Sequence, residues 1–275
     1  VQPSNVGAGV SITPAVAVTI EDGSGNIVTT ATNAVSIAIS NNPASGTLAG
    51  TLTATPVNGV ATFSNLSINN AGTGYTLAAT ATGLASATSS AFNVTAGTAT
   101  KLVFTVQPSN VGAGASITPA VAVTIEDGSG NIVTTATNAV TIAISNNPAS
   151  GTLAGTVTAT PVNGVATFSS LSINKVGTGY TLAATATGLT SATSSAFNVT
   201  AGTAAKLVFT VQPSNVGAGA SITPAVAVTI EDGSGNIVTT ATNAVSIAIS
   251  NNPASGTLAG TLTAAPVNGV ATFSN

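Results

Sequence analysis

Apolar and polar side chains alternate with a period of two in every informative segment of the chain. In residues 139–145, for example, Val140, Ile142 and Ile144 are separated by small or polar residues. Because successive side chains of a β-strand point to opposite faces, this alternation predicts a strand with one buried face. The sequence nowhere shows the three- and four-residue spacing of an amphipathic helix. The chain is therefore predicted to be all-β.

Between residues 101 and 200 the pattern predicts about seven short antiparallel strands, separated by segments rich in Gly, Pro, Asn and Asp. Short strands with turn signals at regular spacing are typical of a β-sandwich, in which two sheets pack face to face. The predicted strands, including both arms of one hairpin, are 101–106, 120–125, 139–145, 156–162, 165–168, 180–185 and 196–200. The residues expected to form the core are Phe104, Val123, Ile142, Phe168, Leu182 and Phe197.

Three local signals are more specific. The pair Asn163-Gly164 suits the positive φ angles of a type I′ turn and predicts a two-residue β-hairpin between the strands that flank it. The alternation slips after Phe168, which predicts a bulge or corner there. Tyr180 follows a glycine-rich segment at the start of a strand, where either a tyrosine corner or a half-buried aromatic residue is expected.

The whole pattern repeats with a period of 105 residues. Residues 1–100 match residues 106–205 at all but eight positions, and residues 206–275 match residues 101–170 at all but four. A repeat of this length has the size of a typical domain, whereas the units of a solenoid have about 20–50 residues and share one continuous core. The sequence therefore predicts tandem Ig-like β-sandwiches, arranged as beads in a row.

Three domains are expected. Residues 1–97 form a repeat whose first strand is incomplete, residues 98–202 a complete repeat, and residues 203–275 a repeat that stops before its last two strands. The linkers consist of five small residues such as 201–205, so adjacent domains are expected to lie nearly in line. An open sandwich exposes an unpaired edge, so we expect either further chain or another molecule to complete the third repeat.

The chain has very few charges. Charged residues make up 3% of it, with a formal net charge of −3, whereas a typical soluble domain has about 25%. Because it has no basic cluster to neutralise phosphates, nucleic acid is not an expected partner. No apolar run reaches the length of about 18 residues that a membrane helix needs, so no membrane insertion is expected. The absence of Cys excludes a disulfide framework.

The residue types present offer little for catalysis. Without His and Cys the chain has no Ser–His or Cys–His pair. Glu126 and Asp127 are adjacent, so they point to opposite faces of a strand and do not share a substrate. No catalytic residue, cofactor or metal site is assigned, and the chain is predicted not to be an enzyme.

Four segments carry a resemblance to a known family. They are 121–127 (VAVTIED), 130–133 (GNIV), 163–168 (NGVATF) and 177–182 (GTGYTL), and the chain repeats them copy by copy. These segments resemble the bacterial Ig-like domains of invasin- and intimin-type adhesins and of long bacterial surface proteins. The resemblance implies a sandwich fold and an extracellular or cell-surface location. It implies little about a ligand, because the fold serves many functions.

Two further hypotheses follow from this resemblance. Asp127, Ser129 and Asn131 alternate as in a calcium loop, but Ca²⁺ takes about 6–8 oxygen ligands and the repeat supplies two carboxylates. The alternative interpretation is a tight turn shaped by Asp and Gly. Lys101 and Asn198 lie on the first and last predicted strands, as the partners of an internal isopeptide bond would. The alternative is a solvated Lys and a surface Asn.

The near-identity of the copies indicates a mechanical role. Copies that bound separate ligands should differ in their loops, whereas copy number changes length. We therefore expect a non-enzymatic structural repeat of an extracellular bacterial stalk or fibre, an adhesin-type spacer. Its expected partners are neighbouring repeats or copies of itself, including polymerisation by strand complementation between subunits. The alternative is a glycan- or host-surface-binding module, and contacts with cell-surface or glycan ligands are expected through regions outside this chain.

Overall fold

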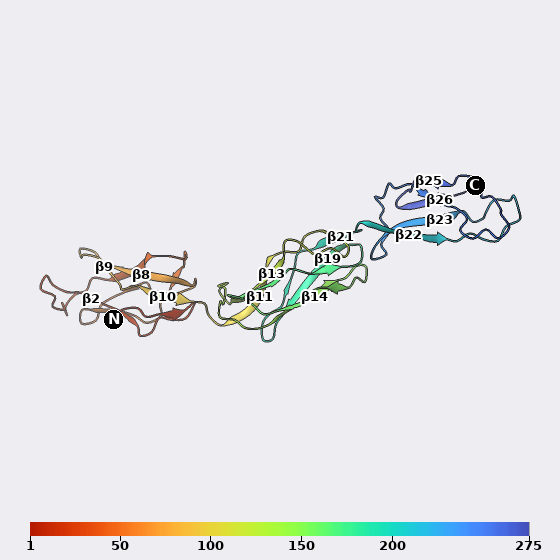
Figure 1. Ribbon diagram of the computed structural model, residues 1–275. Coiled ribbons are helices and arrows are strands. Elements are labelled where there is room, and N and C mark those ends of the chain that lie inside the picture. The colour runs from red at the N-terminus through yellow and green to blue at the C-terminus, as the bar shows by residue number, and fades with distance from the viewer. Residues whose placement is uncertain (275) are drawn as a thin grey trace.

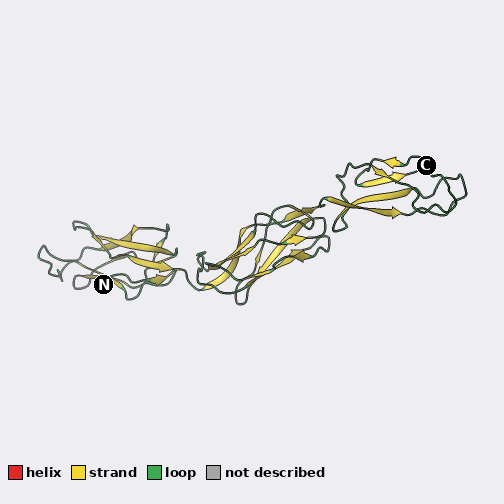
Figure 2. Ribbon diagram, in the orientation of Figure 1, coloured by secondary structure: helices red, strands yellow, loops and turns green. Residues whose placement is uncertain are grey.

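The computed structural model describes residues 1–274, and these residues form 26 β-strands and no helix. The strands make three groups that follow one another in a row (Figures 1 and 2). We call them the N-terminal unit (β1–β10), the central unit (β11–β21) and the C-terminal unit (β22–β26). The prediction of an all-β chain is confirmed. Asn275, the last residue of the predicted third domain, lies outside the described residues.

The central unit consists of two main sheets and a separate β15-β18 pair. One has the strand order β11-β13-β17, and the other has the order β12-β21-β19-β14-β16 with β20 beside β19. All pairs are antiparallel except β12 with β21, which is parallel. This is an Ig-like sandwich, as predicted. Its strands are β11 (Ala99–Val106), β12 (Val111–Gly112), β13 (Val121–Asp127), β14 (Val140–Asn146), β15 (Leu153–Ala154), β16 (Thr158–Ala159), β17 (Val165–Phe168), β18 (Ser172–Ile173), β19 (Gly177–Thr185), β20 (Ala192–Thr193) and β21 (Phe197–Thr200).

The core of the central unit lies between the two sheets. All six residues predicted for it are at most 7% exposed. The rings of Tyr180 and Phe197 contact each other with their centroids 6.1 Å apart. Strand β13 is buried on both faces, since Ala122 and Thr124 are also buried. On the outer face Ala122 and Thr124 lie between residues of β11 and β17, and the hydroxyl of Thr124 donates a 3.3 Å bond to the carbonyl of Val103, which the alternating pattern did not indicate.

The turn at Asn163-Gly164 is confirmed, but the hairpin predicted around it is wrong. Both residues have positive φ, at 50° and 78°, and Val162 and Val165 exchange two main-chain hydrogen bonds of 2.9 and 3.1 Å. However, β16 pairs with β14 in one sheet and β17 pairs with β13 in the other. Only the Val162–Val165 pair closes the turn, and the residues before it leave for the sheet of β14. The turn therefore links the two sheets.

The next strand after Phe168 again pairs in a different sheet. Strand β17 pairs with β13, whereas β18 pairs with β15, so the predicted corner is confirmed. Farther on, the hydroxyl of the fully buried Tyr180 donates a 3.0 Å hydrogen bond to the main-chain carbonyl of Lys175. Tyr75 makes the same 2.9 Å bond to Asn70 in the N-terminal unit. A tyrosine hydroxyl bonded to upstream main chain is the arrangement of a tyrosine corner.

The N-terminal unit has the same second sheet but one strand fewer in the first. Its sheets have the orders β2-β6 and β1-β10-β8-β3-β5, with β9 beside β8, and a separate β4-β7 pair. Val1 exchanges two main-chain hydrogen bonds with Ala17 on β2. Its strands are β1 (Val6–Gly7), β2 (Val16–Thr19), β3 (Val35–Asn41), β4 (Leu48–Ala49), β5 (Thr53–Ala54), β6 (Val60–Phe63), β7 (Ser67–Ile68), β8 (Gly72–Thr80), β9 (Ala87–Thr88) and β10 (Phe92–Thr95).

The C-terminal unit has the first sheet and a remnant of the second. The orders are β22-β23-β26 and β24-β25. The strand β24 has two residues where its counterpart β14 has seven. Strand β14 pairs along its length with β19, and the described part of the C-terminal unit has no such partner. Its strands are β22 (Ala204–Val211), β23 (Val226–Asp232), β24 (Val245–Ser246), β25 (Thr263–Ala264) and β26 (Val270–Phe273).

Each unit has its own hydrophobic cluster, and the three clusters have no buried residue in common. The first alanine of each linker packs on the unit that follows: Ala96 on the central core and Ala201 on the C-terminal core. The linkers are therefore packed against folded units rather than loose. The exact boundaries predicted for the three domains, 1–97, 98–202 and 203–275, stay predictions. Nothing in residues 1–274 qualifies as a helix that could cross a membrane.

Candidate functional site

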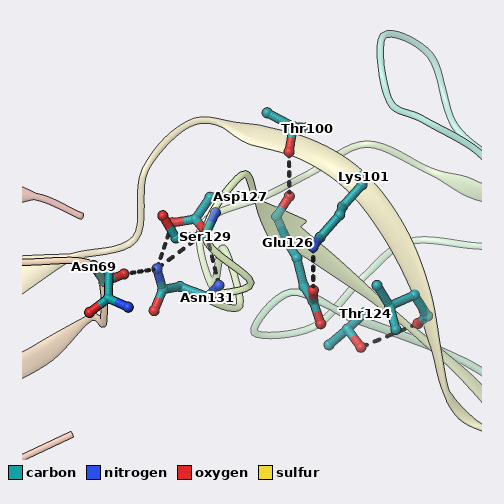
Figure 3. A network of polar contacts seen from close by, with 9 residues as sticks. Asn69, Thr100, Lys101, Thr124, Glu126, Asp127, Ser129 and Asn131 are labelled. Atoms are coloured by element: carbon teal, nitrogen blue, oxygen red, sulfur yellow. Dashed lines mark hydrogen bonds and ion pairs between the residues drawn. The ribbon is translucent and has the colours of Figure 1, made fainter. Parts of the chain in front are cut away.

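A network of polar contacts lies where the N-terminal unit meets the central unit (Figure 3). Asp127 ends β13 and is 2% exposed. Its carboxylate accepts hydrogen bonds from the main-chain N–H groups of Ser129 and Asn131, both 2.9 Å long, and of Gly97 in the linker, 2.7 Å long. Gly130 has a φ of 89°, which glycine adopts without strain. The sequence folds into this turn because Asp can bond N–H groups two and four residues ahead.

Asn131 connects the two units. Its side-chain Nδ2 donates to the carbonyl of Asn69, 2.9 Å away in the preceding unit, and its Oδ1 accepts from the N–H of Ala71 at 2.8 Å. The same Nδ2 also donates to Asp127 at 2.9 Å. Figure 3 shows Asn69 facing Asn131 across the junction. One amide side chain therefore bonds both its own turn and the neighbouring unit.

The second junction repeats these contacts. Asp232 is 1% exposed and accepts from the N–H groups of Asn236 and of Gly202 in the linker, both at 2.9 Å. The side chain of Asn236 donates to the carbonyl of Asn174 at 2.9 Å and accepts from the N–H of Val176 at 3.2 Å. The two junctions thus use equivalent residues in equivalent roles.

The linker glycines are closely packed in both junctions. A Cβ added to Gly202 would lie 2.9 Å from the carbonyl oxygen of Ala113 and 3.3 Å from Oδ2 of Asp232. At Gly97 it would lie 3.3 Å from Oδ2 of Asp127. The small linker residues therefore allow the main chain to approach the buried carboxylate.

Burial and hydrogen bonding act in opposite directions on these carboxylates. Burial by itself raises the pKa of Asp127, but the bonds from Gly97, Asn131 and Ser129 outweigh it and leave the pKa below its ordinary value. The pKa of Asp232 is lowered in the same way, by bonds from Asn236, Gly202 and Ser234 against the effect of burial. Both groups are therefore held as carboxylates at neutral pH.

The N-terminal unit has the same turn, and there it is exposed to solvent. Asp22 accepts from the N–H groups of Ser24 at 2.9 Å and of Asn26 at 3.0 Å, as Asp127 does. The pKa of Asp22 is also lowered, mainly by the bonds from Asn26. Both Asp22 and Asn26 are exposed to solvent. The turn therefore forms from its own sequence, independently of a junction.

The turn fits the tight-turn interpretation of Asp127, Ser129 and Asn131. The three residues do lie together, but both oxygens of Asp127 accept N–H groups and Ser129 contributes its N–H. The groups around the Asp127 carboxylate are therefore N–H donors, whereas a calcium site needs several oxygen ligands that surround the ion. Within the described residues there is no group of three or more acidic, His or Cys side chains that could hold a metal ion.

The two residues considered for an isopeptide bond have other partners. The ammonium group of Lys101 lies 3.5 Å from Glu126, which is opposite it on β13. The side-chain oxygen of Asn198 accepts a 3.0 Å hydrogen bond from the N–H of Gly179. Glu126 and Asp127 occupy the same strand, and they serve an ion pair and a turn respectively rather than one shared site.

Sequence reasoning did not find the bridging role of Asn131 and Asn236. The partners of both side chains across the junctions are main-chain atoms, and these are the same in every residue type. The available signal was the recurrence of Asp and Asn four residues apart in all three repeats. That signal indicated a turn but not what the turn contacts.

Comparison with protein-family models gives no match, and neither does comparison with curated proteins. Among solved structures, the chain is similar to the Escherichia coli adhesin FdeC, with 19% identity over 99% of this chain and 86% of FdeC, at a TM-score of 0.45. It is also similar to invasin, a bacterial integrin-binding protein, with 18% identity over 92% of this chain and 51% of that one, at a TM-score of 0.36. A β-glycosidase from Bacteroides vulgatus is similar over 58% of this chain and 20% of its own, with 16% identity and a TM-score of 0.31.

Adhesins and a glycosidase appear together in this comparison, so the likeness does not by itself separate a binding or structural role from a catalytic one. This chain spans about half the length of the invasin structure and a fifth of the glycosidase. At these identities the comparison concerns the fold alone. By its own strand order the chain is a row of Ig-like β-sandwiches, similar to those of bacterial adhesins.

Proposed function

We propose that this chain is a non-enzymatic structural repeat of an extracellular bacterial stalk or fibre, where it acts as an adhesin-type spacer. The observation that carries the proposal is that three units with separate cores follow one another and are joined by equivalent contacts at both junctions. Each repeat added to such a row lengthens it without changing the existing units.

The surfaces of the repeats support the proposal. Loops that would differ between units with separate ligands are instead nearly identical, since only eight of 100 positions distinguish the first two copies. The two ion pairs among the described residues each join neighbouring strands of one unit, Lys101 with Glu126 and Lys206 with Glu231. The resemblance to bacterial Ig-like surface domains supports an extracellular location.

Electron microscopy of the 275-residue chain and of chains with added 105-residue repeats tests this proposal. The expected image is a single-file string whose length grows by the same increment with each repeat. Light scattering of the same samples provides the control, because it shows whether each particle is one chain. A compact particle whose longest dimension does not grow with repeat number would contradict a spacer role.

A second version, polymerisation by strand complementation, is favoured by one observation. Leu207 and Phe209 on β22 are 57% and 47% exposed, and a surface groove on the N-terminal unit is lined by Val16, Ile37 and Leu77. That groove lies along β2, where β11 lies in the central unit. An extended strand added to an open sheet gains main-chain hydrogen bonds and apolar burial together.

Sedimentation velocity over a range of concentrations tests this version. Strand complementation should give larger particles as concentration rises, and Leu207→Ser should reduce them while the neighbouring Lys206→Ala leaves them unchanged. A chain that stays monomeric at every concentration would contradict complementation between subunits and leave the single-chain spacer intact.

The glycan- or host-surface-binding alternative requires an exposed platform. Tyr75 and Tyr180, the two tyrosines of the chain, are both 0% exposed, so they offer no aromatic surface for a sugar. A glycan array probed with the labelled chain is expected to give no binding. Reproducible binding to one class of glycan would favour the alternative.

A further inference from the structure

We propose that the Asp–x–Ser–Gly–Asn turn is a docking surface for a neighbouring repeat, and that its exposed copy at Asp22–Asn26 docks a further repeat of the same kind. The inference rests on the spacer function and specifies how one spacer unit recognises the next. Its partner is a corner loop that presents a main-chain carbonyl and, two residues on, a main-chain N–H. In this chain those groups belong to Asn69 and Ala71 at one junction and to Asn174 and Val176 at the other.

The surface recognises main chain and not side chains. The corner loops of the two junctions differ in sequence, with Asn70-Ala71 in one and Lys175-Val176 in the other. Two of the few differences between the repeats therefore fall on the docking loop itself. The bonds to the Asn side chain are nevertheless formed at both junctions, because the carbonyl and N–H are present whatever the residue. Any repeat with this corner is a suitable partner.

The corner loop is held rigid from inside its own unit. The hydroxyl of Tyr75 bonds the carbonyl of Asn70, which lies between the two residues that contact Asn131. The side chain of Asn69 in turn accepts a 2.7 Å bond from the N–H of Thr47. The tyrosine corner thereby connects the buried core to the junction, and the loop is preorganised for docking.

The turn on the other side is preorganised as well. Asp22 and Asn26 form the same internal bonds as Asp127 and Asn131 although they have no neighbour. The difference between them is the junction: Asn26 is exposed, whereas the side chain of Asn131 contacts the preceding unit. The exposed turn therefore already has the bonded shape of the two turns that dock a repeat.

Spin-label distances in the full chain test the docking role. The chain has no Cys, so labels at Thr62 and Thr167, which are exposed on β6 and β17, report the first junction alone. Asn131→Ala should broaden this distance distribution and raise the ratio of undocked to docked chains roughly tenfold, as expected for the loss of two hydrogen bonds. Labels at Thr167 and Thr272 should respond to Asn236→Ala in the same way.

Asn26→Ala is the matched control, because it removes the same side-chain bonds to the turn's Asp and no bond across a junction. It should leave both distributions unchanged. A second chain, which carries an extra copy of residues 1–105 in front of Val1, places a corner loop before this turn. In that chain Asn26→Ala should broaden the distance between the added repeat and the old first unit, while the two original junctions stay narrow.

Two results would overturn the inference. One is a distribution across the first junction that Asn131→Ala leaves as narrow as before. The other is an extended chain in which Asn26→Ala has no effect. Neither result touches the spacer function, since electron micrographs would still show units in a row, joined flexibly. Failure of the docking surface and failure of the spacer are therefore distinguishable.

Discussion

Strands β11 and β22 contain the same six residues, Lys-Leu-Val-Phe-Thr-Val, and pair in the same register with β13 and β23. Their inner faces nevertheless differ. Leu102 and Phe104 are 4% and 7% exposed, whereas Leu207 and Phe209 are 57% and 47% exposed. The central unit has β19 and β21 opposite this face, and the described C-terminal unit has no counterpart of either.

The comparison shows that strand pairing and core burial are separate events in this fold. Pairing of β22 with β23 needs segments about twenty residues apart in the sequence. Burial of Phe104 needs β19 and β21, which follow it by more than seventy residues. The entropy of closing a loop grows only slowly with loop length, so these distant contacts cost little more than local ones, and they add the burial of Leu102 and Phe104. Most of the stability of a repeat should therefore depend on its last strands.

The largest expected effect comes from truncating the same side chain in the two units. Phe104→Ala removes a buried ring and should lower the free energy of unfolding of the central unit by about 3–5 kcal/mol. Phe209→Ala should lower that of the C-terminal unit by about 1 kcal/mol or less, because the ring is half exposed. Hydrogen exchange during urea titration, followed unit by unit, measures both. Equal losses for the two variants would show that β22 is as buried as β11.

A smaller effect is expected at the tyrosine corner, which the described C-terminal unit does not contain. Tyr180→Phe removes the bond to the carbonyl of Lys175 and keeps the ring, so it should cost the central unit about 1 kcal/mol. Tyr75→Phe should cost the N-terminal unit a similar amount. The internal control is the unit that the affected loop does not contact, the N-terminal unit for Tyr180→Phe and the C-terminal unit for Tyr75→Phe, and it should unfold as before. A loss of the same size in all three units would mean that the corner acts through the whole chain rather than locally.

The smallest expected effect concerns a feature that the central and C-terminal units share. Because the folded-state pKa of Asp127 and Asp232 is lowered, these groups stabilise the folded chain above the ordinary Asp pKa of about 3.9. That contribution is lost as the pH falls through the lowered pKa, since the unfolded chain then binds more protons. Stability measured from pH 7 to pH 3 should therefore fall at acid pH in both units alike.

The double variant Asp127→Asn and Asp232→Asn should remove this part of the pH dependence. Asp22→Asn is the comparison, because Asp22 forms the turn but is exposed and bonds no linker. If the double variant kept the acid slope of the original chain, other carboxylates would have to account for it.

The fold could be predicted from sequence where side chains alone determine the structure. Val140, Ile142 and Ile144 define a half-buried strand, and Asn163-Gly164 defines a turn with positive φ. The hairpin around that turn was predicted wrongly because nothing in the alternation shows which sheet an arm joins.

The candidate site was predicted only in part for a related reason. Asp127 and Asn131 were recognised as turn residues, and the turn is present in all three repeats. That Asp127 is buried follows from its contact with a linker residue, and that Asn131 joins two units follows from its bonds to main-chain atoms. Side-chain patterns in a single sequence carry no record of main-chain partners, so this part of the site is visible only in the three-dimensional structure.

The most direct measurement is native-state hydrogen exchange of the full chain, read at equivalent amides of β13 and β23. Val123 and Ile125 on β13 face a second sheet of six strands. Val228 and Ile230 on β23 face a second sheet that consists of β24 and β25 among the described residues. If each repeat is stabilised by its own closed core, the β13 amides should exchange far more slowly than those of β23. Equal protection of the two strands would contradict it, because stability would then come from the row as a whole and not from its individual units.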